Sequence, residues 1–140
     1  MERQMTNRGG FVHNEVLLLP VESRLRELGA RVFPEYHVAP GRRSGYVDLF
    51  AVWPRFTVCV EAEMSARRVW RDVEKATLLN ADLLVILTPD CAVRDSCRKA
   101  LGNISSISTI HETAVWILPL LPALQQLTAM ADACGHVESP

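Results

Sequence analysis

The chain is poor in the features that mark several large classes of protein. Its 140 residues include only two lysines, Lys75 and Lys99, and four cysteines that form neither a CxxC motif nor a paired Cys/His spacing. A structural zinc site and a disulfide framework are therefore both unexpected. The net charge is −1, so a nucleic-acid partner would have to be held by a local basic patch and not by the overall charge.

Long apolar runs are missing as well. The longest such stretch, Ala114–Leu124, contains two prolines and is too short to span a membrane, and the polar start of the chain has no signal-peptide pattern. We therefore expect a cytoplasmic protein that does not associate with membranes. The pattern divides it into a flexible N-terminal arm (residues 1–12), a single domain (13–134) and a disordered tail (135–140).

Apolar periodicity and capping residues predict helices alternating with strands. The expected helices run from the Asn14 cap to Leu28 and over Ala66–Asn80, Cys91–Leu101 and Pro122–Ala133; the expected strands span Arg31–Val38, Tyr46–Trp53, Phe56–Glu63, Asp82–Leu87 and Ala114–Leu118. Pro20 must either kink the first helix or move its start to Val21. The order αβββαβαβα indicates an α/β domain with a mixed sheet. The second and third strands are expected to form a hairpin across Pro54-Arg55.

Three acids occur in the two strands of this hairpin, which are otherwise apolar. If the turn has two residues, its register places Asp48 opposite Glu61, with Cβ atoms about 4.5–5.5 Å apart. Glu63 then projects from the same face of the sheet. Like charges this close are destabilising, whereas a hard cation such as Mg²⁺ binds carboxylate oxygens. The three acids therefore predict a divalent-metal site; the alternative is that they lie at exposed strand ends or pair with arginines.

The segments Gly45–Asp48 (Gly-Tyr-Val-Asp) and Val60–Glu63 (Val-Glu-Ala-Glu) resemble the core of the PD-(D/E)xK nucleases, particularly that of Holliday junction resolvases and small restriction-endonuclease-like proteins. The resemblance covers residues 10–101. It implies a restriction-endonuclease-like αβββαβ core, with a central mixed sheet flanked by helices. It also implies that Asp48 and Glu61 bind Mg²⁺ or Mn²⁺.

Glu63 departs from the family pattern, because a lysine that orients or activates the attacking water is usual at this place. A glutamate can act there as a general base or bind a second metal ion, and Lys75 in the following helix is a candidate to replace the lysine. A glutamate of the first helix often completes the family's metal site, and Glu15 fits that place better than Glu22. The resemblance thus implies the catalytic residues Asp48, Glu61, Glu63 and Lys75, and the metal ligands Asp48, Glu61 and Glu15.

Arginines and tryptophans are the two residue types near these acids that could contact nucleic acid. The arginines that are candidates for phosphate contacts are Arg42 and Arg43 before the second strand and Arg67, Arg68 and Arg71 at the start of the second helix. The alternatives are a solvated loop and a polar helix face with an Arg68–Asp72 pair. Trp53, Trp70 and Trp116 are expected in the core and not as base-stacking platforms.

The sequence therefore predicts a divalent-metal-dependent endonuclease that hydrolyses DNA phosphodiester bonds. Cutting a duplex or a junction requires two sites, so we expect a homodimer; a protein partner within a larger nucleic-acid-processing system is also open. One alternative is a catalytically inactive nuclease-fold module that binds nucleic acid or a protein partner, favoured by the missing motif lysine. The other is a small α/β sensor or regulatory domain, favoured by the near-neutral charge.

Overall fold

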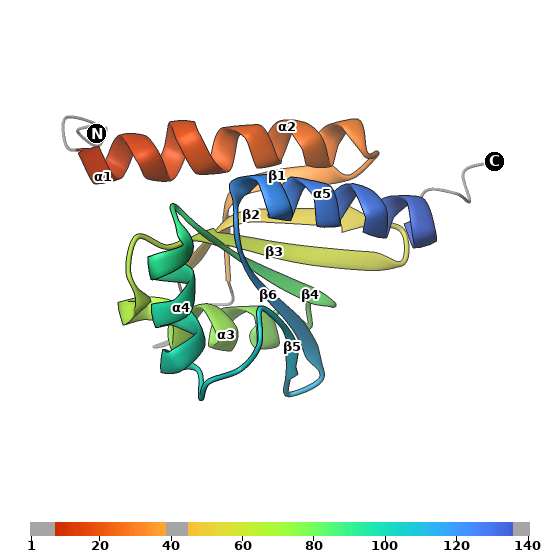
Figure 1. Ribbon diagram of the computed structural model, residues 1–140. Coiled ribbons are helices and arrows are strands. Elements are labelled where there is room, and N and C mark those ends of the chain that lie inside the picture. Colours follow the sequence, from red (N-terminus) through yellow and green to blue (C-terminus); the bar gives the residue numbers. More distant parts are fainter. Residues whose placement is uncertain (1–7, 39–44, 136–140) are drawn as a thin grey trace.

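A computed structural model describes residues 8–38 and 45–135. Its centre is a six-stranded sheet in the order β1-β2-β3-β4-β6-β5 (Figure 1). The strands are β1 (Arg31–His37), β2 (Tyr46–Trp53), β3 (Phe56–Ala62), β4 (Leu83–Thr88), β5 (Ile107–Ile110) and β6 (Thr113–Pro119). Strands β1 to β3 pair antiparallel, β3, β4 and β6 pair parallel, and β5 pairs antiparallel with β6. The predicted α/β class with a mixed sheet is thus confirmed.

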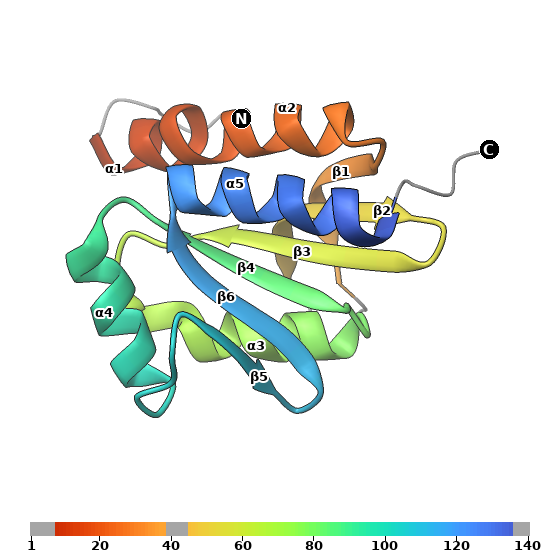
Figure 2. The same cartoon turned by 45° about the vertical axis from the view of Figure 1, so that its right-hand side comes forward.

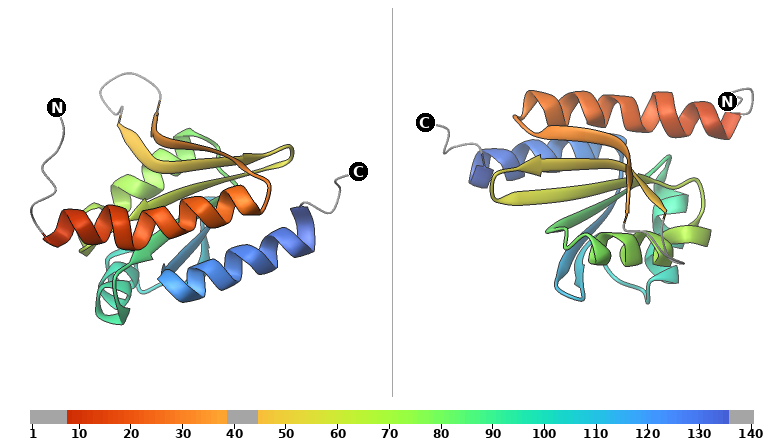
Figure 3. Two further views of the ribbon diagram at one scale, coloured as in Figure 1. Left: turned by 90° about the horizontal axis from the view of Figure 1, so that it is seen from above. Right: turned by 180° about the vertical axis from the view of Figure 1, so that it is seen from behind.

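Helices cover both faces of the sheet. They are α1 (Arg8–Phe11), η1 (Val12–Leu18), α2 (Leu19–Glu27), η2 (Ala66–Arg68), α3 (Val69–Leu78), α4 (Cys91–Ala100), α5 (Leu120–Met130) and η3 (Ala131–Gly135). Helices α2 and α5 lie on one face, and α3 and α4 on the other (Figure 2). Seen from above, α2 and α5 run side by side (Figure 3), and Arg24 Nη1 donates to Thr128 Oγ1 between them over 2.8 Å.

The central strand β4 explains why the core has two halves. All six of its residues are buried, as expected for a parallel strand with helices on both faces. Leu83, Val85 and Leu87 pack into the half under α2 and α5, whereas Leu84 and Ile86 pack into the half under α3 and α4. Side chains of a strand alternate between faces, so this one apolar run joins both halves.

The first helix starts earlier than the sequence predicted. Helical backbone begins at Arg8, so the predicted cap Asn14 is wrong and part of the expected arm, residues 8–12, is helical. Asn14 lies inside η1, a wider helical stretch in which the Leu19 N–H donates to the Asn14 carbonyl. Pro20 then falls at the start of α2, directly after the wider helical turns of η1. Within residues 8–38 and 45–135, no helix combines the length and apolar character needed to cross a membrane.

Later element boundaries follow the local signals closely. Ser65 Oγ accepts from the Arg67 N–H at the start of η2, and Asp90 Oδ1 accepts from the Val93 N–H at the start of α4, as N-caps do. Strand β5 was not predicted, because its four residues are too few to show a period. Arg42 and Arg43, residues 1–7 and most of the predicted tail lie outside the described residues.

Candidate functional site

The β2–β3 hairpin has the register that a two-residue turn predicts. Its pairs run from Trp53–Phe56 to Leu49–Val60, so the next position places Asp48 opposite Glu61. The Asp48 N–H donates to Glu61 Oε1 over 3.3 Å, and the Ala62 N–H donates to Asp48 Oδ2 over 2.9 Å. The two carboxylates therefore meet at one end of the hairpin, as the sequence predicted.

These carboxylates line a cavity of about 610 Å³, here called the carboxylate cavity. It lies where β3 ends and the chain turns into α3, and the carboxyl ends of strands are where open α/β sheets bind ligands. Its acidic side chains are Asp48, Glu61, Glu63 and Asp72, and its basic side chains are His13, Arg67, Arg68, Arg71 and Lys75. Elements far apart in the sequence thus bring both signs of charge to one cavity.

Helix α3 contributes two buried charged residues to this cavity. Lys75 Nζ lies 2.9 Å from Glu61 Oε2 and 3.9 Å from Asp72 Oδ1, and it donates to the Tyr46 carbonyl over 2.7 Å. The side chain of Asp72 is 1% exposed. The lysine proposed to replace the motif lysine is therefore in contact with the predicted metal ligand Glu61.

Asp72 was missed as a site residue by the sequence analysis, which placed it on a polar face of the helix. A usable signal was present in its spacing. Asp72 follows Val69 by three residues and precedes Ala76 by four, and both of these are buried. Residues three and four apart share a helix face, so Asp72 had to point inward with the apolar stripe.

Burial shifts the titration of two acids in the cavity. Loss of solvent raises the pKa of Glu61 to about 8, the negative charge of Asp48 adds to the rise, and the charge of Lys75 opposes it. Burial likewise raises the pKa of Asp72 to about 11, helped by a hydrogen bond with Glu63. A hydrogen bond between two carboxyl groups needs a proton, which a cation bound to both groups would displace.

His13 of η1 approaches the same site. Its Nε2 lies 3.2 Å from Asp48 Oδ2, and its Nδ1 lies 2.9 Å from Asn14 Oδ1. The hydrogen bond with Asp48 raises the pKa of His13 to about 9, so the imidazole is cationic at neutral pH and donates from both nitrogens. No spacing in the sequence connects His13 with the acids, because the contact depends on how the N-terminal helix crosses the end of the sheet.

Glu15, the glutamate predicted to complete the metal site, does not line the cavity. It is exposed on η1, and His13 occupies the place next to Asp48 instead. Its rival Glu22 pairs with Arg26 on α2 over 2.8 Å. The first helix thus reaches the site through an imidazole and not through a carboxylate.

The predicted arginine rim of α3 and η2 does line the cavity, with Arg67 and Arg68 exposed and Arg71 half-buried. Arg71 Nη1 lies 3.1 Å from Glu74 Oε1. Gly45 allows the close approach of this rim to β2, since a Cβ at that position would lie 3.0 Å from Arg71 Nη2.

The donor set fits a hard divalent cation. One carboxylate oxygen from each of Glu61, Glu63 and Asp72 lies within 4.8 Å of the others, and two oxygens that each lie about 2.0–2.6 Å from one ion are at most about 5 Å apart. Asp72 Oδ2 is buried and accepts no hydrogen bond from the described residues. Such an atom lacks the partner that a buried oxygen normally has, and a cation or a shared proton would provide it.

Comparison with known proteins adds no assignment to this geometry. No protein-family model, no curated protein and no solved structure matches the chain. The fold and the site together define an α/β protein with a lysine-paired carboxylate cavity.

Proposed function

We propose that the protein is a divalent-metal-dependent endonuclease that hydrolyses DNA phosphodiester bonds in the carboxylate cavity. The proposal assigns it a PD-(D/E)xK-type site within a restriction-endonuclease-like core. The observation that carries it is the 2.9 Å contact between Lys75 Nζ and Glu61 Oε2. Glu63 stands where the motif lysine is usual. Lys75 of α3 instead brings an ammonium group to the Glu61 carboxylate.

The acids of the cavity and Lys75 have separate parts in this chemistry. Glu61, Glu63 and Asp72 offer oxygens that lie close enough together for one Mg²⁺ or Mn²⁺, and Asp48, which faces Glu61, is the further proposed ligand. A cation bound there would polarise the phosphodiester. Glu63, which is less buried than Glu61, would orient the attacking water and accept its proton, and Lys75 would stabilise negative charge that develops on the phosphate.

The arginine rim extends this site to a nucleic-acid strand. Arg67, Arg68 and Arg71 lie beside the acids, and a nuclease needs contacts with phosphates that do not depend on sequence. Arginine suits them because its planar guanidinium forms paired hydrogen bonds with phosphate oxygens. Cleavage of both strands of a duplex requires two such cavities, so we also propose a homodimer, which sedimentation velocity of the purified chain would test.

A non-catalytic nuclease-fold module that binds nucleic acid or a protein partner is the second candidate. The observation that favours it is that His13 and Lys75 already pair with Asp48 and Glu61. These contacts give the two proposed metal ligands partners from the protein itself in place of a metal ion. A site retained only for binding could keep such pairs after catalysis was lost.

Titration calorimetry with Mg²⁺ and Mn²⁺ separates these candidates. The wild-type chain should bind at least one of the two ions, and Asp48→Asn and Glu61→Gln should each weaken binding more than tenfold. Glu27→Gln is the matched control, because Glu27 is exposed on α2 and lies outside the cavity.

Cleavage assays complete the test. Plasmid, single-stranded and branched DNA are incubated with the wild-type chain and Mn²⁺, and both cavity variants should abolish any cutting. Absence of metal binding would refute the catalytic proposal. Metal binding with all three DNA substrates intact would select the non-catalytic module.

A further inference from the structure

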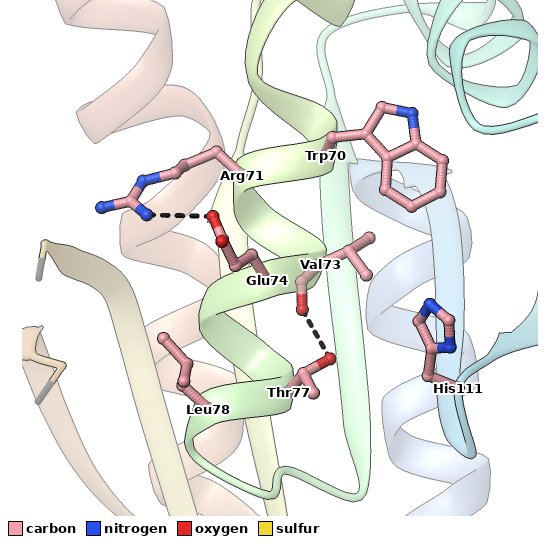
Figure 4. A pocket seen from close by; sticks show the side chains of 7 residues that line it. All are labelled: Trp70, Arg71, Val73, Glu74, Thr77, Leu78 and His111. Carbon is pink, nitrogen blue, oxygen red and sulfur yellow. Dashed lines mark hydrogen bonds and ion pairs between the residues drawn. The ribbon is translucent and has the colours of Figure 1, made fainter. Parts of the chain in front are cut away.

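A second cavity lies on the outward side of α3, next to the carboxylate cavity. Its volume is about 500 Å³, and it is here called the tryptophan groove. Its lining residues are Trp70, Arg71, Val73, Glu74, Thr77 and Leu78 of α3 and His111 of the β5–β6 turn (Figure 4). Arg71 belongs to the wall of both cavities, so the groove and the proposed active site adjoin at this residue.

Trp70 provides the groove with a fixed aromatic surface. Its side chain is 52% exposed, compared with 6% for Trp53, so the expectation that Trp70 lies in the core is wrong. Its Nε1 donates to the Ala100 carbonyl over 3.0 Å, which holds the indole against α4 while leaving it open to solvent. An aromatic ring that is already held in place loses little conformational freedom when a ligand stacks on it.

His111 extends this surface from the other side of the groove. Figure 4 shows its imidazole and the Trp70 indole projecting on the same side of α3. His111 and Glu112 have φ values of 50° and 70°, a left-handed conformation that side-chain-bearing residues adopt at a cost. Two-residue hairpin turns of this kind favour Asn-Gly. The turn therefore keeps an imidazole beside the groove at its first position, where local stability alone would prefer asparagine.

We propose that the tryptophan groove holds an unpaired base of a DNA strand whose backbone passes the arginine rim into the carboxylate cavity. This inference rests on the proposed function and names its substrate as DNA that is single-stranded at, or next to, the scissile bond. An exposed aromatic ring beside an arginine-lined track is typical of single-strand binding. In a continuous duplex both faces of each base are covered, so a base reaches the indole only after unstacking.

The charges around the groove favour a nucleic acid over a protein as its occupant. Of the described residues that line it, only Glu74 is acidic, and that carboxylate lies 3.1 Å from Arg71 Nη1. The exposed guanidinium groups of Arg67 and Arg68 line the adjoining carboxylate cavity. A strand can therefore place phosphates on this rim and the neighbouring base on the apolar floor of the groove.

Fluorescence anisotropy with the full chain tests the proposal. The probes are a fluorescein-labelled 20-nucleotide single strand and the matching duplex, both with EDTA so that no cleavage occurs. Trp70→Ala should weaken single-strand binding roughly 5- to 100-fold and duplex binding less than twofold, and Trp70→Phe should recover most of the loss. Phe11→Ala is the matched control, because Phe11 is 53% exposed and lines neither cavity; it should bind like wild type.

A series of oligonucleotides with one abasic site tests the stacking directly and does not depend on how well the Trp70 variants fold. At one position along the strand, the abasic site should weaken binding to the wild-type chain as much as Trp70→Ala does. In the Trp70→Ala protein the same abasic site should cost little more, because the two changes remove one contact. A uniform effect of the abasic site at every position would overturn the proposal.

The remaining outcomes distinguish this inference from the proposed function. If wild type binds metal and cuts duplex DNA while Trp70→Ala binds single strands like wild type, the groove proposal fails and the nuclease proposal stands. If Trp70→Ala converts a dimer to a monomer without weakening single-strand binding, the groove is an interface between copies of this chain and the proposal is refuted. Loss of metal binding in wild type contradicts the nuclease proposal itself.

Discussion

Replacing Glu61 with glutamine should make the metal-free protein more stable, and increasingly so as the pH rises. Glu61 is 3% exposed, and burial, followed by the charge of Asp48, raises its pKa from 4.5 to about 8. A raised pKa means that the folded state holds its proton more tightly than the unfolded chain does. The stability associated with this proton is therefore fully present below pH 4.5 and is lost as the pH rises through 8.

The size of the effect follows from that shift. One pKa unit corresponds to about 1.36 kcal/mol, so a rise from 4.5 to about 8 sets an upper limit of about 5 kcal/mol. Between pH 5 and pH 9, the stability of the wild type relative to Glu61→Gln should fall by about 4 kcal/mol. Asp72 is present in both proteins, so its own titration largely cancels. Glutamine keeps the volume of the side chain and an oxygen that can accept from Lys75.

Urea unfolding at pH 5, 7 and 9 in the presence of EDTA measures this difference. The two proteins should have similar free energies of unfolding at pH 5, and the variant should be clearly more stable at pH 9. If the free energies of unfolding of the two proteins changed with pH in parallel, the claim that ionisation of a buried Glu61 destabilises the fold would be refuted. Added Mg²⁺ or Mn²⁺ should stabilise the wild type at pH 9 by mass action and leave the variant unchanged. That result would connect the destabilising Glu61 carboxylate with the proposed metal site.

Three further predictions concern single residues. Lys75→Met should lower the rate of DNA cleavage about 10²- to 10³-fold with a much smaller change in KM, as expected for a group that stabilises transition-state charge. Lys99→Met is the control, since Lys99 is exposed on α4. Equal cleavage rates for the two variants would contradict the role assigned to Lys75. The pKa of His13, raised to about 9 by Asp48, should fall back towards 6.5 in Asp48→Asn when the imidazole is titrated by NMR. The stability that the His13–Asp48 contact gives should be fully present below pH 6.5 and lost as the pH rises through 9. Asp90→Ala removes the N-cap of α4 and should cost about 1 kcal/mol in thermal or urea unfolding, whereas an unchanged midpoint would mean that the cap contributes nothing.

Local sequence patterns predicted most of the elements that have clear boundaries. Strand β4 is an unbroken apolar run between a turn and a cap, and it was found almost to the residue. The hairpin register followed from one two-residue turn, because each pair along an antiparallel ladder fixes the next. Those two facts are enough to place Asp48 against Glu61 from the sequence alone.

The wrong helix start at Asn14 and the unpredicted strand β5 share a physical cause. Asn14 looked like a cap, but helical contacts in η1 extended the helix past it to Arg8. Strand β5 is held by its pairing with β6, and four residues carry too little intrinsic preference to show that pairing in advance. Both elements are decided by neighbours that a local window does not contain.

The sequence by itself determined that Asp48 and Glu61 lie on two adjacent strands, that Glu63 follows at the end of the second strand, and that a lysine follows on the next helix. It could do so because turn length, strand alternation and capping act over a few residues. Tertiary structure alone decided that Lys75 contacts Glu61, that Asp72 faces Glu63, that His13 replaces Glu15 beside Asp48, and that Trp70 stays exposed. Those outcomes depend on the angles at which α3 and η1 pack across the end of the sheet, and long-range packing of this kind leaves no fixed spacing in the chain.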